Sequence, residues 1–372
     1  MIIKEVITEA VDKDSRLVLK RIKTSHGDFS NRKLAISNFM YNCEKDRMKY
    51  GQPLFNGIFQ TYHLRFDKVL NDWDYLGLGN AKKHAETNNR IFIPYKPRND
   101  EKLSQMKWKD SISDFKIMVG KVENVPFIIP LDATLNNWKK HRVEAISLLS
   151  PSQSLVPIIS SKHNVSHFPT IIKYEIGKSN LIGIHSYELR DITERTNLSY
   201  LRAINSDTKT GDKTSLFVNF NYPRILTRYL SIAGCFAFNC FAGDVFSERT
   251  IFPTGIPRMV RNYMFDKKPD EYNFYDFKEK KFNKSLPQKE WYGIDLTKSS
   301  MANVSVLQGL NGYQLIKCIS HIKQQDDLDL INALILNKQN VIEHLRNYTG
   351  WGVFLDTIVL PSAQTQQTLL KF

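Results

Sequence analysis

Short apolar runs that alternate with helix-like stretches dominate the sequence between residues 115 and 245. The runs are rich in β-branched or aromatic residues, and six follow one another: FKIMVGKV, VPFIIPLD, LVPIIS, NLIGIH, SLFVNF and CFAFNCF. The last five begin at intervals of roughly 20–35 residues, which suits one strand followed by one helix. Continuous apolar strands separated by amphipathic helices are typical of parallel strands covered by helices. The sequence therefore predicts an α/β fold.

The stretches between the runs have the features of helices. Four are expected, at Asn136–Leu149, Phe168–Gly177, Asp191–Asn205 and Pro223–Ala233. Strand-plus-helix units of this kind suit a (β/α)8 TIM-like barrel with extra N-terminal and C-terminal segments, or a doubly wound parallel sheet. Because no G-x-G-x-x-G turn follows the first strand, we favour the barrel.

Composition divides the chain into four parts. They are an N-terminal part that is compatible with early barrel strands, the core β/α units, a basic aromatic insertion, and C-terminal helices with a closing segment: 1–110, 111–250, 251–298 and 299–372. In the first part Arg32–Arg47 has helical spacing of apolar residues, and Gly77–Gly79 is interpreted as a loop.

The formal net charge of +14 and the isoelectric point near 9.4 point to a polyanionic partner. Nucleic acid is the first expectation and an anionic membrane surface the second. The alternative is that an AT-rich genome encodes a protein rich in Lys and Asn, which would produce the same positive charge without such a partner. Basic residues interleaved with aromatics after the core suit phosphate pairing and base stacking. The alternative is a solvated insertion that packs on the barrel. The candidate phosphate-binding residues are Arg249, Arg258, Arg261, Lys267 and Lys268.

The four cysteines, Cys43, Cys235, Cys240 and Cys318, are few and scattered. Their spacing predicts neither a disulfide framework nor a zinc site, and no metal or cofactor is expected. The N-terminus lacks the apolar core of a signal peptide, and no apolar run approaches the roughly twenty residues that span a bilayer. We expect a cytoplasmic protein with no membrane partner.

Polar residues recur where the apolar runs end. Because ligands bind at the carboxyl ends of parallel strands, these residues are expected to line one ligand-binding site. They are Asp132, Ser160, Ser161, His185, Asn219, Asn221, Asn239 and Asp244. Helix caps, turns and satisfied surface groups are the alternative for each of them. G-x-S-x-G, H-E-x-x-H and Walker A motifs are absent, so catalysis would rest on carboxylates, with Asp132 and Asp244 as the leading pair.

The order of five segments resembles the barrel of the tRNA-guanine transglycosylase (queuine/archaeosine) superfamily, which includes enzymes that act on 7-deazaguanine in DNA. The segments are LFNGIFQTY, FIIPLDAT, LVPIISS, LIGIHSYE and NFNYPRILTRYLSIAGCFAFNCF, about a third of the chain. The resemblance implies that Asp132 reads the base and that Ser160, Ser161, Gly183 and His185 line the substrate site. Asn239 stands where the family has its nucleophilic Asp, Phe55 replaces another Asp, and the zinc-binding Cys and His residues are missing.

The resemblance implies a divergent guanine or 7-deazaguanine transglycosylase that acts on tRNA or DNA by base exchange. Two alternatives remain open. One is a non-catalytic nucleic-acid-binding barrel, as a homodimer or as the partner subunit of an active paralogue. The other is a barrel enzyme that acts on a small phosphorylated or sugar substrate. Polynucleotide binding with a steep salt dependence favours the former, and tight binding of a small anion favours the latter.

The resemblance makes a direct prediction about activity. Base exchange needs a carboxylate that attacks the anomeric carbon as guanine leaves, and an amide is too weak a nucleophile for this step. If Asp132 reads the base, Asp132→Ala abolishes incorporation of labelled guanine into tRNA or DNA, and Asn239→Asp raises incorporation. A native protein that exchanges no base in any RNA or DNA removes the enzyme interpretation.

Overall fold

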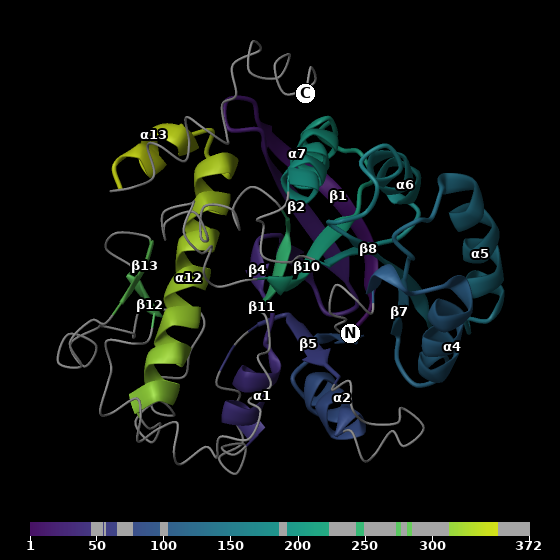
Figure 1. Cartoon of the computed structure of the whole chain (residues 1–372). Helices are drawn as coiled ribbons and strands as arrows, with labels where there is room; N and C mark the ends of the chain where they lie inside the picture. The colour runs from purple at the N-terminus through teal and green to yellow at the C-terminus, as the bar shows by residue number, and fades with distance from the viewer. Residues whose placement is uncertain are drawn as a thin grey trace.

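The computed structural model describes residues 1–45, 55, 57–64, 77–96, 103–185, 192–222, 243–248, 273–276, 281–284 and 312–348. The described part has an α/β fold built on a six-stranded sheet in which every neighbouring pair is parallel (Figure 1). The strand order is β4 (Lys33–Leu34), β11 (Val245–Glu248), β10 (Leu216–Tyr222), β9 (Leu181–His185), β8 (Ser154–Ser160) and β7 (Asn124–Ile128). This arrangement confirms the predicted α/β class and the parallel strands.

A second parallel pair consists of β5 (Phe59–His63) and β6 (Ile91–Tyr95). It is linked to the chain just after β4, because the Ile36 N–H donates to the Phe59 carbonyl at 2.8 Å and the Thr61 N–H donates to the Ile36 carbonyl at 3.1 Å. At its other side, Asn124 of β7 donates its side-chain amide to the Phe92 carbonyl of β6 at 3.1 Å. The pair therefore contacts both β4 and β7.

Helices follow most of these strands. They are α1 (Asn38–Lys45), α2 (Leu78–Thr87), α4 (Trp108–Met118), α5 (Leu135–Ser147), α6 (Phe168–Glu175), α7 (Ile192–Ser206), α12 (Gly312–Leu336) and α13 (Val341–Arg346). Figure 1 shows α4, α5 and α6 at the right of the view and α12 at the left, and buried residues of α12 such as Ile322 belong to the same apolar cluster as residues of α5 and α6. The positions of α5, α6 and α7 confirm the three predicted helices that lie within the described ranges.

Two apolar clusters lie on the two faces of the strands. The outer cluster contains Phe127, Trp138 and Phe168, where strand side chains meet helix side chains. The inner cluster contains alternate residues of the same strands, among them Val156 and Val218. Side chains of a strand alternate between its faces, so continuous apolar runs fit strands that are buried on both faces.

Two sequence expectations differ from the structure. FKIMVGKV does not form a strand, because its first residues belong to α4, where Phe115 and Met118 are buried three positions apart on one helical face. Gly77–Gly79 is not a loop, because Gly77 is the N-cap of α2 with a φ of 67°, a conformation that glycine adopts without strain. The predicted strand CFAFNCF and the helix Pro223–Ala233 lie outside the described residues.

The first forty-five residues contain structure that the sequence reading did not resolve. The antiparallel sheet β1 (Ile3–Asp12), β2 (Leu17–Thr24) and β3 (Asp28–Ser30) precedes β4, and only α1 occupies part of the helix expected at Arg32–Arg47. In the basic insertion, β12 (Asn273–Asp276) and β13 (Lys281–Lys284) form an antiparallel pair beside α12 (Figure 1). Among the described residues, no helix combines the length and the apolar character required to cross a bilayer.

The N-terminal sheet covers the amino ends of the parallel strands. Thr214, just before β10, donates its N–H to the Val6 carbonyl at 2.9 Å, and Asn180, just before β9, donates its side-chain amide to the Ile3 carbonyl at 2.9 Å. Apolar side chains of the N-terminal sheet, such as Val6 and Ile22, belong to the inner cluster. The sheet therefore covers the amino ends of these strands and packs against the inner cluster.

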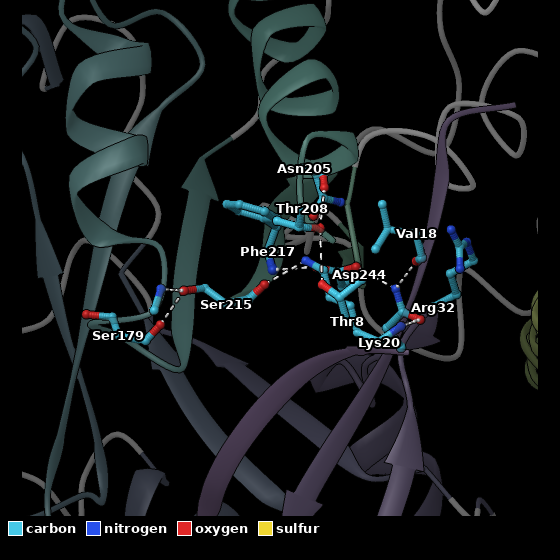
Figure 2. Close-up of polar contacts among 12 residues, drawn as sticks. Thr8, Val18, Lys20, Arg32, Ser179, Asn205, Thr208, Ser215, Phe217 and Asp244 are labelled. Atoms are coloured by element: carbon cyan, nitrogen blue, oxygen red, sulfur yellow. Dashed lines mark hydrogen bonds and ion pairs between the residues drawn. The ribbon is translucent and has the colours of Figure 1, made fainter. Parts of the chain in front are cut away.

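A buried ion pair fixes this sheet to the strands. Lys20 of β2 donates to the Asp244 carboxylate at 2.7 Å, and the two side chains are 0% and 1% exposed (Figure 2). Asp244 also accepts from the Phe217 N–H at 2.9 Å and from the Asn31 side chain at 2.7 Å. Burial lowers the pKa of Lys20, whereas the adjacent Asp244 carboxylate acts in the opposite direction.

Replacement of Lys20 tests how much this ion pair contributes to stability. Lys20→Met leaves the Asp244 carboxylate buried without its cation, so the free energy of unfolding is expected to fall by about 3–5 kcal/mol in urea titrations. The matched control on the same strand is Lys23→Met, whose pair with Glu5 at 3.1 Å is 39% and 37% exposed. The control should change stability by less than about 1 kcal/mol.

The double variant Lys20→Met/Asp244→Asn removes both charges together and keeps a side-chain oxygen as acceptor for the buried donors of Phe217 and Asn31, so it should recover part of the lost stability. Equal stability losses in Lys20→Met and Lys23→Met contradict the role assigned to the buried pair.

Candidate functional site

Four rings meet at the carboxyl ends of strands that lie far apart in the sequence. We call them the ring cluster: His63 of β5, Tyr95 of β6, His185 of β9 and Phe220 of β10. Tyr95 stacks on Phe220 with ring centroids 4.4 Å apart and an interplanar angle of 17°. It contacts His63 edge-on at 5.4 Å and His185 at 5.5 Å. The carboxyl ends of these strands thus contain a buried group of flat aromatic and imidazole rings.

The His63 main chain is held by Asn38, the first residue of α1. The Asn38 carboxamide oxygen accepts from the His63 N–H at 2.7 Å, and its amide group donates to the His63 carbonyl at 2.9 Å. The side chain is held separately, because Nε2 lies 3.0 Å from the Ser247 hydroxyl of β11. Thr61 extends this contact, with its hydroxyl 2.6 Å from that of Ser247. His63 is therefore fixed in both backbone and ring.

Burial sets the charge of this imidazole. His63 is 1% exposed, and desolvation lowers its pKa to about 3. The ring is consequently neutral near pH 7, with one nitrogen as a donor and the other as an acceptor. A neutral imidazole can exchange directional hydrogen bonds with an uncharged ligand edge without a buried charge to compensate.

Asp132 lies at the same edge, in the turn between β7 and α5, and is exposed. It does not cap α5, because Thr134 is the N-cap residue. The neighbouring loop after β8 is tied to this turn by His163, whose Nε2 donates to the Ala133 carbonyl at 2.9 Å. Asp132 is thus available to solvent on the rim, and its proposed base-reading role stays a prediction.

Ser160 and Ser161 end β8 at the carboxyl edge, beside His185. Both are buried. The Ser160 hydroxyl accepts from the Lys162 N–H at 3.0 Å, and the Ser161 hydroxyl donates to Glu194 of α7 at 2.8 Å. These contacts organise the turn after β8, and a role of either serine in substrate binding stays a prediction.

Gly183 has a packing role within β9. A Cβ atom at this position would lie 2.7 Å from the Phe220 ring and 2.7 Å from the Ile158 side chain. Only a residue without a side chain lets Phe220 lie this close to β9, so Gly183 positions one ring of the cluster. A direct contact of Gly183 with substrate stays a prediction.

Asn219 is adjacent to Phe220 in β10, and alternation along the strand places it on the opposite face. Its side chain is buried against Gly243, where an added Cβ would lie 2.2 Å from the amide nitrogen. We expected every polar residue near a strand end to face one binding site, but side chains of adjacent strand residues point to opposite faces. Asn219 therefore points away from the ring cluster.

Asp244 differs from its expected position. It was assigned to the end of an apolar strand, but β11 begins at the next residue, so Asp244 lies at the amino edge with Lys20 and Asn31 (Figure 2). Asp132 and Asp244 are consequently at opposite ends of the parallel strands and do not form a carboxylate pair. The physical reason is that Asp244 serves as the acceptor for groups of the N-terminal sheet.

The side chains of the remaining candidate site residues lie outside the part of the chain that the structure describes. Asn221 lies within β10, but its side chain is outside the described set. Also outside the described residues are Asn239, Arg249, Arg258, Arg261, Lys267 and Lys268.

The sequence reading missed His63, Tyr95 and Ser247. The segments FQTYH and IFIPY are short, and Pro94 argues against a central strand, so neither was identified as a strand. Gln60, which matched the transglycosylase pattern, faces the other side of β5. There its amide donates to the Ala81 carbonyl at 2.9 Å beside the buried Glu44–Arg90 ion pair. The available signal was a polar residue at the end of each segment: His63 is the last residue of FQTYH, and Lys96 directly follows IFIPY.

Comparisons with known proteins add no family assignment. No protein-family model matches the chain, and no curated protein matches it. Among the described residues, no group of three or more His, Cys, Asp or Glu side chains could hold a metal ion.

Burial of His63 predicts a pH dependence of stability. Its folded pKa of about 3 lies below the unfolded value of 6.5, so the unfolded chain binds more protons between these values. Stability is therefore fully present above about pH 6.5 and falls as the pH drops, by up to about 1.4 kcal/mol per pH unit.

Urea titrations at about pH 7 and pH 5 measure this effect, and His63→Gln should lose up to about 2 kcal/mol less than the native protein over that interval. His26→Gln, in an exposed turn, is the matched control and should follow the native protein. Parallel pH profiles for the native protein and His63→Gln would contradict the burial of a neutral imidazole.

Proposed function

We propose that this chain is a (β/α)8 barrel that binds nucleic acid and receives a base at the carboxyl edge of its strands. The ring cluster is the observation that carries the proposal. Tyr95 of β6 contacts Phe220 of β10 and His185 of β9, although β6 pairs with β5 in a separate two-stranded sheet. Such contacts between strands that do not pair with each other support a curved sheet in which β5 and β6 lie between β4 and β7.

Two further contacts support this closed arrangement. Main-chain hydrogen bonds of Ile36 connect the end of β4 to β5, and the Asn124 side chain connects β7 to β6. With the parallel pairings already described, these contacts link eight strands in sequence order. The N-terminal sheet covers the amino end, so a ligand would enter from the carboxyl end, as in other parallel barrels.

The chemistry of the edge favours a planar, uncharged heterocycle. Aromatic faces stack on bases of any sequence, with about 1–3 kcal/mol per stacked base. The neutral His63 adds directional hydrogen bonding, and the net charge of +14 supplies the attraction to phosphates. The rings are themselves buried, so a base would contact them after side chains at the edge move aside.

Base exchange is the more specific form of this proposal. Asp132, exposed on the rim, supports it because a carboxylate there could read a guanine-like base. The second carboxylate expected from the sequence, Asp244, is at the opposite edge, so the geometry supports base binding more strongly than exchange. In the transglycosylase hypothesis, the nucleophile would come from another residue.

Binding of a labelled single-stranded oligonucleotide, followed by fluorescence anisotropy, tests the proposal. The affinity should fall steeply between about 50 mM and 200 mM salt, because phosphate contacts release counterions. Tyr95→Leu should weaken binding by about 5-fold to 150-fold at fixed salt, which corresponds to loss of one stacking contact. Tyr200→Leu is the control, because this half-buried tyrosine of α7 packs against the outer cluster and is not part of the ring cluster, and it should bind like the native protein.

Circular dichroism establishes that both variants are folded. Equal affinities of the two tyrosine variants contradict base binding at the ring cluster. Tight binding of ribose 5-phosphate without oligonucleotide affinity would instead favour an enzyme of small phosphorylated sugars.

A further inference from the structure

We propose that His63 Nδ1 is the group that recognises the edge of the bound base, and that the Ser247 and Thr61 hydroxyls set whether this nitrogen donates or accepts. This inference rests on the proposed function and adds the residue that reads the ligand. It starts from an unusual feature of the ring, since Nδ1 is buried and has no hydrogen-bond partner within the described part of the chain.

An unpaired buried nitrogen is costly, because the group loses its hydrogen bonds to water. The other contacts of His63 are complete: Asn38 pairs with its main-chain N–H and carbonyl, and Ser247 lies 3.0 Å from Nε2. The position at the carboxyl end of β5 places the ring where barrels bind ligands. A ligand with a polar edge would therefore supply the missing partner of Nδ1.

The hydroxyl pair controls the tautomer of the ring. If Ser247 donates to Nε2, the proton of the neutral imidazole is on Nδ1, which then donates to the ligand, and Thr61 can donate to Ser247. If Nε2–H donates to Ser247, that hydroxyl donates to Thr61, and Nδ1 accepts from the ligand. Rotation of two hydroxyl groups with transfer of one proton between the ring nitrogens interconverts the two states, and no charge is created.

This arrangement suits the edge of a purine. Guanine offers acceptors at O6 and N7, whereas adenine offers the N7 acceptor beside an N6 donor. Nδ1–H would bind either N7 or O6, and the unprotonated Nδ1 would bind the adenine amino group. The Tyr95 ring, which contacts the His63 ring at 5.4 Å and stacks on Phe220, is the aromatic group nearest to hand for stacking on such a base.

Nuclear magnetic resonance of the full chain with ring-labelled ¹⁵N histidine tests the inference, with guanosine and adenosine as probes. Saturating guanosine should shift the Nδ1 resonance of His63 and leave that of the exposed His26 unchanged. In Thr61→Val the Ser247 hydroxyl has lost its Thr61 partner, so it should donate to Nε2 and fix the Nδ1–H tautomer. If His63 is instead an Nε2–H tautomer in Thr61→Val, the Ser247 and Thr61 hydroxyls do not control the tautomer as proposed.

Binding measurements complete the test. His63→Gln should bind guanosine about tenfold more weakly, the loss expected for one hydrogen bond to a buried partner, whereas His26→Gln should bind like the native protein. If guanosine or an oligonucleotide binds but the Nδ1 resonance does not move, this inference fails and the proposed function stands. If neither nucleoside nor oligonucleotide binds, the proposed function fails and this inference fails with it.

Discussion

The buried carboxylate of Asp244 is the constraint on which the architecture depends. It accepts hydrogen bonds from Lys20 and Asn31 of the N-terminal segment and from the main chain of β10, while its own carbonyl accepts from the Lys33 N–H of β4. A charge with almost no exposure is tolerated only when its partners are complete. The contacts of this residue therefore fix β4, β10 and β11 against the sheet that covers their amino ends.

This constraint gives the two ends of the parallel strands different compositions. The amino end contains the buried Lys20–Asp244 ion pair and apolar side chains of the N-terminal sheet that belong to the inner cluster. At the carboxyl end, neutral polar groups replace the ion pair: His63, Ser247 and Thr61 lie among aromatic rings. The division agrees with parallel α/β folds in general, where strand ends on one side bind ligands and those on the other side stabilise the fold.

The electrostatic character of the two ends follows from the same burial. Lys20 retains a carboxylate partner, whereas the His63 ring has hydroxyl and aromatic neighbours, and desolvation lowers its pKa to about 3. The neutral His63 ring thus lies in a chain with a net charge of +14. In the proposed function, surface cations attract the phosphates without regard to sequence, and the neutral imidazole reads the base.

The apolar runs were sufficient to predict the α/β class, the parallel strands and helices α5, α6 and α7, because strands buried on both faces require continuous apolar sequence. They did not reveal β5 and β6, whose short segments carry polar residues and a proline, nor the helical state of Phe115, which depends on packing against Phe127 of β7. Asp132 and His185 were placed at the carboxyl edge because each directly follows or ends an apolar run.

What the sequence by itself determined is the local pattern: which segments are apolar enough to be strands, and that the chain is strongly basic. Only the tertiary structure decided which face each polar residue occupies and which end of the strands it joins. Asp244 and Asn219 show the physical reason, since a strand boundary shifted by a few residues moves a carboxylate to the opposite edge, and a one-residue step reverses the face. The ring cluster likewise depends on contacts of Tyr95 with His185, 90 positions away, and with Phe220, 125 positions away, which no local pattern encodes.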